Sequence, residues 1–393
     1  MTHHLALSIK QTAIMSKHIK QRERLSMRVG LLTSDLNYRH GWGTYSLSLL
    51  KSLQAHGIDL TIVSARNNTY LNIDTQAILP SVAPQERFSM AKMALIAPQV
   101  RDLLRECDVI HTTIELYAPL VDWIAGVRPR FMTAHGSYIH LPRIRRFPVD
   151  RIYQRAFRHS QIICVSQHTQ TIAHRVIPDA QTHVIRNAVD AERFADIQHQ
   201  ASPTPTIVTL GGVKQRKGTL ELIEAVSRVR EQLPDVQCHV LGSLNAEVRY
   251  VERVRARIEA LGLQDNVTLH GFVSDAEMRQ WYARADVFAL PSIDDGWKFE
   301  GFGLATMEAS ASGVAVIGTR QSGASDAIDD GETGILISAD HLIPELSDAL
   351  LYILSHPERA RKMGDAGRRK AQAHSWQNVG TQVIGLYREA LKS

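Results

Sequence analysis

Short apolar runs and amphipathic stretches alternate along most of the chain. The run MRVGLLTS at residues 27–34 has the length and aliphatic content of a buried strand, and the stretch from about Thr44 to His56 has the apolar spacing of a helix. Gly57 ends that helix, and IDLTIVSA at residues 58–65 follows as a second strand. This order predicts a βαβ unit with two parallel strands.

The alternation continues on both sides of one interruption. Residues 194–206, FADIQHQASPTPT, lose the apolar spacing and gather prolines, which is typical of a linker. Further strands are predicted at residues 108–111, 130–134, 161–165, 206–212, 236–243, 266–272, 286–292 and 313–319, with helices near 219–230, 246–261, 275–283 and 303–312. The pattern predicts an α/β protein with two doubly wound domains, residues 27–200 and 201–374.

Two terminal segments lie outside these domains. Residues 1–26 lack the long apolar core and the cleavage site of a secretory signal, so we predict a disordered extension, with a basic amphipathic anchor as the alternative. Residues 375–393 have the spacing of a C-terminal helix that could pack back on the N-terminal domain.

Composition narrows the class of protein. Of the 393 residues, 44% are apolar and 22% are charged, which is typical of a globular protein and excludes disordered and collagen-like chains. Cys107, Cys164 and Cys238 stand far apart in apolar runs, so we expect buried thiols in a reducing compartment such as the cytoplasm. No apolar run reaches the roughly 20 residues of a membrane-spanning helix.

The net charge of +5 is unevenly divided along the chain. Residues 1–200 contain about 24 Lys and Arg against about 15 Asp and Glu, so the first half is basic. The densest basic segment is RIRRFPVDRIYQRAFR at residues 143–158. It could face an anionic membrane surface or a phosphorylated acceptor, or it could be the solvated face of a helix. We expect no nucleic-acid partner.

A glycine turn follows the first strand. Gly41 and Gly43 have GxG spacing, which lets backbone amides approach a phosphate or a sugar. Ser46 stands where a dinucleotide-binding fingerprint has its third glycine, and residues 64–66, SAR, offer no acid for a ribose. Both gaps argue against a nicotinamide-dependent dehydrogenase.

A second glycine turn, GGVKQRKG at residues 211–218, follows the first strand of the second half. Its glycines free the backbone, and Lys214, Arg216 and Lys217 offer cations for a diphosphate. The turn lacks the residue order of a Walker P-loop, and a solvated basic loop is the alternative interpretation.

Two carboxylates surround a Gly-Phe-Gly turn in EGFGLATME at residues 300–308. If a helix begins near Phe302, its amides favour an anionic group there, and Glu300 and Glu308 lie up to about 12 Å apart. A retaining glycosidase needs its carboxylates roughly 5.5 Å apart. The spacing instead suits an extended ligand, with a carboxylate for a sugar at one end and for a ribose at the other.

These segments together resemble the retaining glycosyltransferases of family four. The resemblance covers nearly the whole chain from Met27 and depends on EGFGLATMEA, DVFALPSIDDGWKF, GGVKQRKGTLELIEAV, VSQHTQ, VIRNAVDAERF and SGASDAIDDGETGILI. It implies the GT-B fold, with two facing Rossmann-like domains and a cleft between them. The first would be the acceptor-side domain and the second the nucleotide-sugar-binding domain.

The resemblance also implies roles for the matching residues. Glu300 would hold hydroxyls of the donor hexose, His135 would lie close to the transferred sugar, and Lys217 would neutralise the leaving diphosphate. Glu308 would bind the nucleotide ribose. Donor contacts are implied for Gly41, Gly43, Lys214, Arg216, Phe302, Gly303, Leu304 and Glu308. Residues 187–190, NAVD, belong to an interdomain signature that we interpret as structural.

Three positions depart from the family pattern. Many relatives have an arginine in place of Gly212, so Lys214 or Arg216 would have to supply the second cation for the diphosphate. Asp326 stands where glutamate is common, and Ala188 where glycine is common. Neither of these two changes removes a reacting group.

The implied activity is transfer of a hexose from a UDP- or GDP-sugar to a hydroxyl of a saccharide or lipid-linked acceptor, with retention, in polysaccharide or glycolipid synthesis at the inner face of a membrane. No DxD motif is present, and Asp294 with Asp295 does not make a metal site, so we expect no metal and no cofactor. A nucleotide-sugar epimerase, a sugar phosphorylase and a non-catalytic sugar-nucleotide-binding relative remain alternatives.

Overall fold

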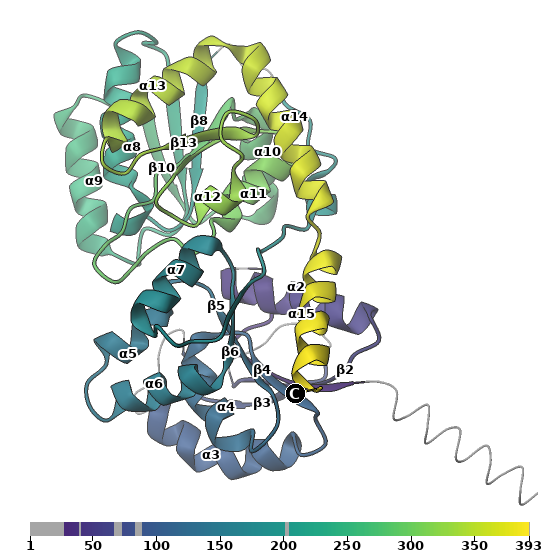
Figure 1. Ribbon diagram of the computed structural model, residues 1–393. Coiled ribbons are helices and arrows are strands. Elements are labelled where there is room, and N and C mark those ends of the chain that lie inside the picture. Colours follow the sequence, from purple (N-terminus) through teal and green to yellow (C-terminus); the bar gives the residue numbers. More distant parts are fainter. Residues whose placement is uncertain (1–26, 39–40, 67–72, 83–88, 201–203, 393) are drawn as a thin grey trace, which may run out of the picture. The chain divides into compact units, whose positions relative to one another are not determined.

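The computed structural model describes residues 27–38, 41–66, 73–82, 89–200 and 204–392 (Figure 1). The extension predicted at residues 1–26 lies outside the described residues. Two β-sheets, of seven and six strands, are formed, and helices connect most successive strands. The predicted α/β class with two sheets is therefore confirmed.

The first sheet has the strand order β3-β2-β1-β4-β5-β6-β7, and β1 pairs in parallel with β2 and β4. Its strands are β1 (Arg28–Thr33), β2 (Asp59–Ala65), β3 (Gln76–Leu79), β4 (Val109–Thr112), β5 (Arg130–Ala134), β6 (Gln161–Cys164) and β7 (Thr182–Val184). Its helices are α2 (Gly41–Ala55), α3 (Ser89–Leu103), α4 (Ala118–Ile124), α5 (Leu141–Ile144), α6 (Val149–His159) and α7 (Gln167–Val176).

The strands predicted from apolar runs in this sheet are confirmed, whereas β3 and β7 were not predicted. Buried side chains such as Leu31 and Ile62 supply the apolar signal of β1 and β2. In β3 only Leu79 is buried, and all three residues of β7 are half-buried. Strands this short and this open to solvent carry no readable apolar pattern.

The second sheet has the order β10-β9-β8-β11-β12-β13, and each strand pairs in parallel with its neighbours. Its strands are β8 (Thr206–Leu210), β9 (Gln237–Leu241), β10 (Val267–Gly271), β11 (Val287–Leu290), β12 (Ala315–Thr319) and β13 (Gly334–Ile337). The helices are α8 (Thr219–Arg230), α9 (Val248–Ala260), α10 (Asp275–Arg284), α11 (Leu304–Ala311), α12 (Ala324–Ala327), α13 (Leu342–Ser355) and α14 (Pro357–Ala373). A final helix, α15 (Trp376–Ala390), follows α14 in the chain.

One apolar core holds the second sheet together. Val226 of α8, Val240 of β9 and Leu350 of α13 are all buried in it. The three cysteines are buried thiols, as predicted, and burial raises the pKa of Cys238 to about 12. A thiol with so high a pKa stays protonated and acts as a small apolar side chain.

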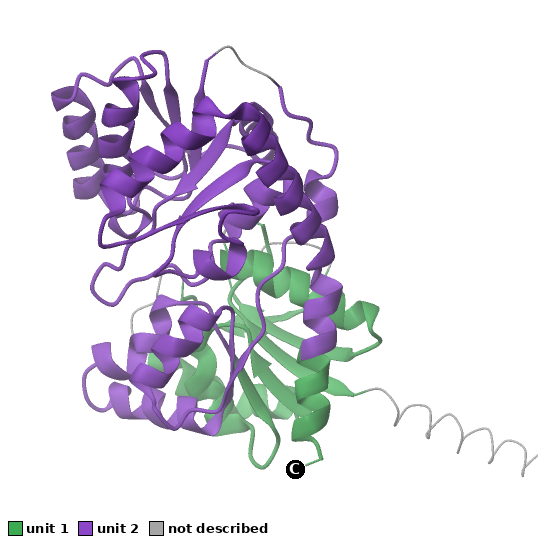
Figure 2. Cartoon of the chain, turned by 45° about the horizontal axis from the view of Figure 1, so that its top comes forward, with its two compact units in different colours: residues 1–132, 383–393 green, residues 133–382 purple. Residues whose placement is uncertain are grey.

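Contacts divide the chain into two compact units, coloured separately in Figure 2. Unit 1 contains residues 1–132 and 383–393, and unit 2 contains residues 133–382. In unit 1, Tyr387 near the end of α15 shares a hydrogen bond of 2.5 Å with His111 Nδ1, and its ring lies edge-on to Phe131 at 4.9 Å between centroids. The domain limits proposed from the sequence stay predictions. None of the described helices is long and apolar enough to cross a membrane.

A histidine pair lies on the edge of the second sheet. His239 Nδ1 on β9 is 3.0 Å from His270 Nε2 on β10, and the ring of Trp281 lies 4.0 Å from that of His239. Burial, followed by the charges of His270 and Arg284, lowers the pKa of His239 to about 4. As the pH falls, the unfolded chain therefore binds a proton at His239 before the folded protein does. The contribution of His239 to the free energy of unfolding, present above pH 6.5, is lost as the pH falls toward 4.

We predict that His239→Gln flattens the acid dependence of stability. Thermal unfolding of the wild type and the variant, measured at steps between pH 6.5 and 4, should show a larger fall of the unfolding temperature in the wild type, because only the wild type has this proton uptake on unfolding. Equal falls in the two proteins would contradict the assignment.

Candidate active site

Three of the predicted site residues meet in one ion-paired cluster. A 3₁₀ turn, η4 (Gln215–Lys217), follows β8 and places Arg216 and Lys217 on the same carboxylate. Arg216 Nη1 and Lys217 Nζ each lie 2.6 Å from Glu300 Oε2. The side chains of Glu300 and Lys217 are only 11% and 13% exposed, so the cluster is largely withdrawn from water.

The charges of this cluster decide its protonation. Burial alone would raise the pKa of Glu300, but Lys217 and then Arg216 outweigh it and bring the pKa to about 2. Burial lowers the pKa of Lys217, and the carboxylate of Glu300 opposes that shift. With Glu300 ionised, the two cations leave one positive charge in excess. The cluster is therefore electropositive and suited to an anion.

Lys214 adds a further cation beside the glycine turn. It is the N-cap residue of η4, and burial, reinforced by the nearby Arg216, lowers its pKa. A Cβ atom built on Gly212 would lie 3.3 Å from Lys214 Cε, so the lysine stem runs past Gly212. The position at which relatives have an arginine is thus next to a lysine in this chain.

The segment after β11 contains the second part of the site. Gly303 has a left-handed backbone, with φ of +81°, and is the N-cap of α11, which begins at Leu304. No side chain caps this helix, so its first amides carry the positive end of the helix dipole without a local carboxylate. Phe302 is buried and Leu304 is half-buried.

Backbone atoms of two segments approach closely beside Glu300. A Cβ atom on Gly301 would lie 1.7 Å from the carbonyl oxygen of His135, so only glycine fits there. Ser137 Oγ accepts a hydrogen bond of 3.0 Å from Phe299 N. His135, predicted to lie close to the transferred sugar, is therefore held next to the loop that carries Glu300.

Two hydroxyl groups to which the sequence analysis gave no role stabilise the position of Gly301 beside His135. Ser166 Oγ donates to the carbonyl oxygen of Gly301 at 2.6 Å, and Thr169 Oγ1 donates to the same oxygen at 3.1 Å. Both residues belong to the segment VSQHTQ, which supports the family resemblance. That segment was a usable signal, because small hydroxyl residues just after a strand commonly bind backbone.

Asp326 is structural in this chain. Its Oδ1 pairs with Arg186 Nε at 2.5 Å, and its Oδ2 accepts from the backbone N of Gln167 at 2.8 Å. The shorter side chain at this position therefore still joins α12 to α7 and to the segment after β7.

Glu308 has a different environment from Glu300. It lies on α11, and Tyr282 Oη is 3.5 Å from its Oε2. Burial raises the pKa of Glu308 to about 7; Arg193 opposes the shift and Asp275 adds to it. Because Arg193 does not outweigh the burial of this carboxylate, neutral donors such as ribose hydroxyls would suit it.

Gly41 and Gly43 lie in unit 1, at the first turn of α2, which begins at Gly41 rather than near Thr44. A Cβ atom on Gly43 would lie 2.5 Å from the carbonyl oxygen of Asn37, so the glycine permits a tight turn after β1. Within the residues that the structure describes, no three His, Cys, Asp or Glu side chains form a metal-binding group.

We predict that Gly301→Ala destabilises the protein, because the new methyl group overlaps the His135 carbonyl and must push two segments apart. The expected loss is about 1–3 kcal/mol in the free energy of unfolding, measured by urea denaturation. Gly385→Ala is the matched control, since a Cβ atom there meets nothing within 4 Å. Equal unfolding free energies for the two variants would refute the close approach.

Two family models match consecutive parts of the chain. The model "Glycosyltransferase Family 4" matches residues 40–193, and "Glycosyl transferases group 1" matches residues 190–370. Together they cover the chain from the first glycine turn to α14.

Curated relatives are similar to long parts of the chain. A GDP-mannose-dependent alpha-(1-6)-phosphatidylinositol monomannoside mannosyltransferase of Mycolicibacterium smegmatis is 28% identical over 311 residues, which is 74% of this chain and 79% of that protein. A D-inositol 3-phosphate glycosyltransferase of an Arthrobacter species is 33% identical over 183 residues, 46% of this chain. The chain spans only 42% of the length of the latter relative.

Solved structures share the fold. Sucrose-phosphate synthase of Thermosynechococcus elongatus has a TM-score of 0.75 at 19% identity, covering 92% of this chain and 98% of that chain. The Anabaena protein HepE, solved with UDP and glucose, has a TM-score of 0.71 at 19% identity, covering 92% of this chain and 100% of that one. These likenesses, with the two parallel sheets, confirm the predicted GT-B fold. The two family models together match residues 40–370 and confirm the predicted family: the chain belongs to the family-four glycosyltransferases.

Proposed function

We propose that this protein is a retaining hexosyltransferase that moves a hexose from a UDP- or GDP-sugar to a hydroxyl of a saccharide or lipid-linked acceptor. The observation that carries the proposal is the contact of Arg216 and Lys217 with Glu300, close in sequence to the uncapped start of α11. A diphosphate binds to cations and backbone amides, and the hydroxyls of a hexose donate hydrogen bonds to a carboxylate. The cluster provides the cations and the carboxylate, and the start of α11 provides the amides.

The leaving diphosphate is stabilised by cations. Negative charge develops on the phosphate as the glycosidic bond breaks, and Lys217, Arg216 and Lys214 are fixed around the turn that would receive it. Their positions are set before substrate arrives, because Glu300 holds two of them. Such preorganised charge lowers the barrier without reorganisation during the reaction.

Cations also take the place of a metal in this proposal. Neutralising a diphosphate is the work that a divalent ion does in many transferases, and two cations with a helix start supply the same sign of charge. Asp295 is close to Lys298, at 3.7 Å, which lowers its availability as a metal ligand. We therefore propose catalysis without a metal or a cofactor.

Retention follows from attack on the face from which the diphosphate leaves. In this scheme no side chain forms a bond to the sugar, and the departing phosphate oxygen takes the proton of the acceptor hydroxyl. Glu300 accepts hydrogen bonds from hexose hydroxyls, and His135 supports the sugar from the neighbouring segment. Glu308 accepts hydrogen bonds from the ribose at the far end of the donor.

The named relatives support the substrate class. The Mycolicibacterium enzyme is named for GDP-mannose and a phosphatidylinositol mannoside, and the Arthrobacter enzyme for inositol 3-phosphate. Both acceptors carry a polyol ring and a phosphate. An anionic polyol or saccharide acceptor is therefore our proposal for this chain, in the synthesis of a glycolipid or a surface polysaccharide. Epimerisation, phosphorolysis and binding without turnover would each leave such an acceptor unglycosylated.

The test is a screen of UDP-, GDP- and ADP-sugars by thermal shift and by release of the nucleotide, with and without EDTA. We expect one nucleotide to stabilise the protein, insensitively to EDTA, and Glu308→Ala to lose that shift. Lys217→Ala should reduce nucleotide release about 10²- to 10³-fold, as loss of an electrostatic stabiliser does. Lys362→Ala, an exposed lysine of α14, is the matched control. If no nucleotide sugar stabilises the wild type, the proposed function is wrong.

A membrane surface is the second part of the proposal, at the cytoplasmic face. Phe147, between α5 and α6, is 82% exposed, and the neighbouring Arg143, Arg146, Arg151 and Arg155 are also exposed. The opposite side of α6 is buried through Tyr153 and Phe157. An exposed aromatic ring among arginines suits a membrane interface with anionic headgroups.

Sedimentation with lipid vesicles tests this surface. We expect the protein to bind phosphatidylcholine vesicles that contain about 30% phosphatidylserine, and pure phosphatidylcholine much less. The double change Arg146→Glu and Arg151→Glu should weaken binding at least about tenfold, since each lost charge is equivalent to about 1 kcal/mol. The pair Arg255→Glu and Arg361→Glu, exposed on α9 and α14, is the control. Unchanged binding of the first pair would exclude this surface.

A further inference from the structure

A tight turn precedes Glu300. Asp295 N donates to Lys298 O at 2.8 Å, and Lys298 N donates back to Asp295 O at 2.9 Å. Gly296 has a left-handed backbone, with φ of +62°, which this reversal of the chain requires. The turn therefore fixes the backbone on both sides of Trp297.

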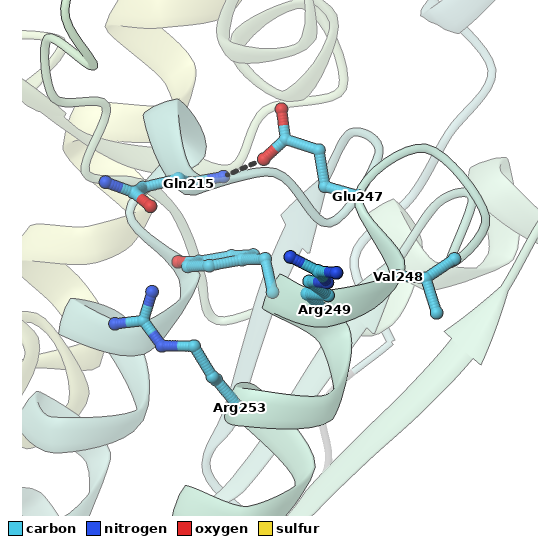
Figure 3. Close-up of a pocket in the computed structure, with 6 residues that line it drawn as sticks. Gln215, Glu247, Val248, Arg249 and Arg253 are labelled. Atoms are coloured by element: carbon cyan, nitrogen blue, oxygen red, sulfur yellow. Dashed lines mark hydrogen bonds between the residues drawn. The ribbon is translucent and has the colours of Figure 1, made fainter.

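Polar contacts anchor this turn to the cationic turn η4. Lys298 Nζ lies 3.0 Å from Glu247 Oε1, and the other oxygen of Glu247 accepts from Gln215 N at 2.9 Å, as the dashed line in Figure 3 shows. Gln215 Nε2 also donates to Asp295 Oδ1, at 3.3 Å. The turn is thus fixed by charges and hydrogen bonds to the residue that precedes Arg216.

Gln215 and Glu247 also line a pocket of about 410 Å³, together with Val248, Arg249, Tyr250 and Arg253. Figure 3 shows the residues of this pocket.

Two aromatic side chains, one of them from this turn, contact each other. Trp297 lies with its ring 6.0 Å from that of Tyr138, between centroids, at an interplanar angle of 57°. Both residues are half-buried, unlike the core aromatics Tyr117 and Phe288, which are fully buried. Below them Phe299 is buried, with the His140 ring edge-on at 6.0 Å.

Trp297 and Tyr138 lie on the two segments that carry Glu300 and His135 of the candidate active site. Trp297 precedes Glu300 by three residues, and Tyr138 follows His135 by three residues. The hydrogen bonds between Ser137 Oγ and the backbone of Phe299 join the two segments between the rings and the cluster. The rings are therefore held at a fixed offset from the reacting centre.

Polar groups accompany the rings. Asp294 is exposed at the start of the turn. Burial lowers the pKa of His140, with Arg143 adding to the shift and the charge of Asp294 opposing it, which favours a neutral imidazole. A partly open aromatic face with adjoining hydroxyl-binding groups is the chemistry that binds a sugar or polyol ring, whose C–H face is apolar and whose rim is polar.

We propose that Trp297 and Tyr138 form a stacking platform for the pyranose or polyol ring of the acceptor. The inference rests on the proposed function for the identity of that ring as acceptor. The acceptor assignment, rather than the donor, follows from the division of the site: the donor hexose and diphosphate already have Glu300 and the cations of η4 as partners, which leaves the two rings for the second sugar or polyol ring. Trp297 would then determine which acceptor is used.

Saturation-transfer NMR on the full chain tests the platform directly. The probes are methyl α-D-mannopyranoside, methyl α-D-glucopyranoside and myo-inositol, each in the presence of UDP or GDP. We expect transfer to the ring protons of at least one probe. Trp297→Ala should weaken its binding about tenfold, whereas Trp297→Phe keeps an aromatic face and retains most of it. Trp123→Ala, which removes a partly exposed tryptophan of unit 1, is the control and should bind as the wild type does.

The outcomes separate the two levels of inference. Equal binding by wild type and Trp297→Ala, or no binding of any of the three probes, would overturn the platform. Loss in Trp297→Phe as large as in Trp297→Ala would also overturn it, because a ring face would then not be what binds. Absence of UDP and GDP signals in the wild type would instead contradict the proposed function, while the saccharide signals still decide the platform.

Discussion

The buried carboxylate of Glu300 between Arg216 and Lys217 is the interaction on which the site depends. A buried cation pair without its carboxylate, or the carboxylate without its cations, would be strongly unfavourable. Two irregular segments, the turn η4 and the loop before α11, are therefore fixed to each other by charge. The pKa of about 2 at Glu300 means that this bond persists over the whole physiological pH range.

A glycine, which has no side chain, provides the second constraint. Gly301 lets the loop touch the His135 carbonyl, and Ser166 and Thr169 satisfy the Gly301 carbonyl that such an approach would otherwise leave buried. Charge thus fixes the loop on one side and close backbone packing fixes it on the other. The position of Glu300 follows from both, without support from a regular strand or helix.

Much of this could be predicted from the sequence, and the remainder has identifiable physical reasons. Helix α8 was predicted at its observed limits, because its buried and exposed positions alternate with a clear helical period. The strand β13 and the helices α13 and α14 were not predicted. Glu300 and Lys217 were assigned from residue type and from the family resemblance. Their direct contact was not, since residues 83 positions apart leave no local trace of pairing.

The two glutamates of EGFGLATME show why residue type alone is an incomplete guide. Burial acts on both, yet the pKa of Glu300 is about 2 and that of Glu308 is about 7, because Lys217 and Arg216 outweigh burial at Glu300 whereas Arg193 does not at Glu308. In the proposed reaction a diphosphate would compete with Glu300 for Arg216 and Lys217, which releases carboxylate lone pairs toward the hexose hydroxyls. Binding of the phosphate and binding of the sugar are then coupled through shared cations. Glu308, which lies outside this ion-paired cluster, would instead accept hydrogen bonds from the hydroxyls of the ribose.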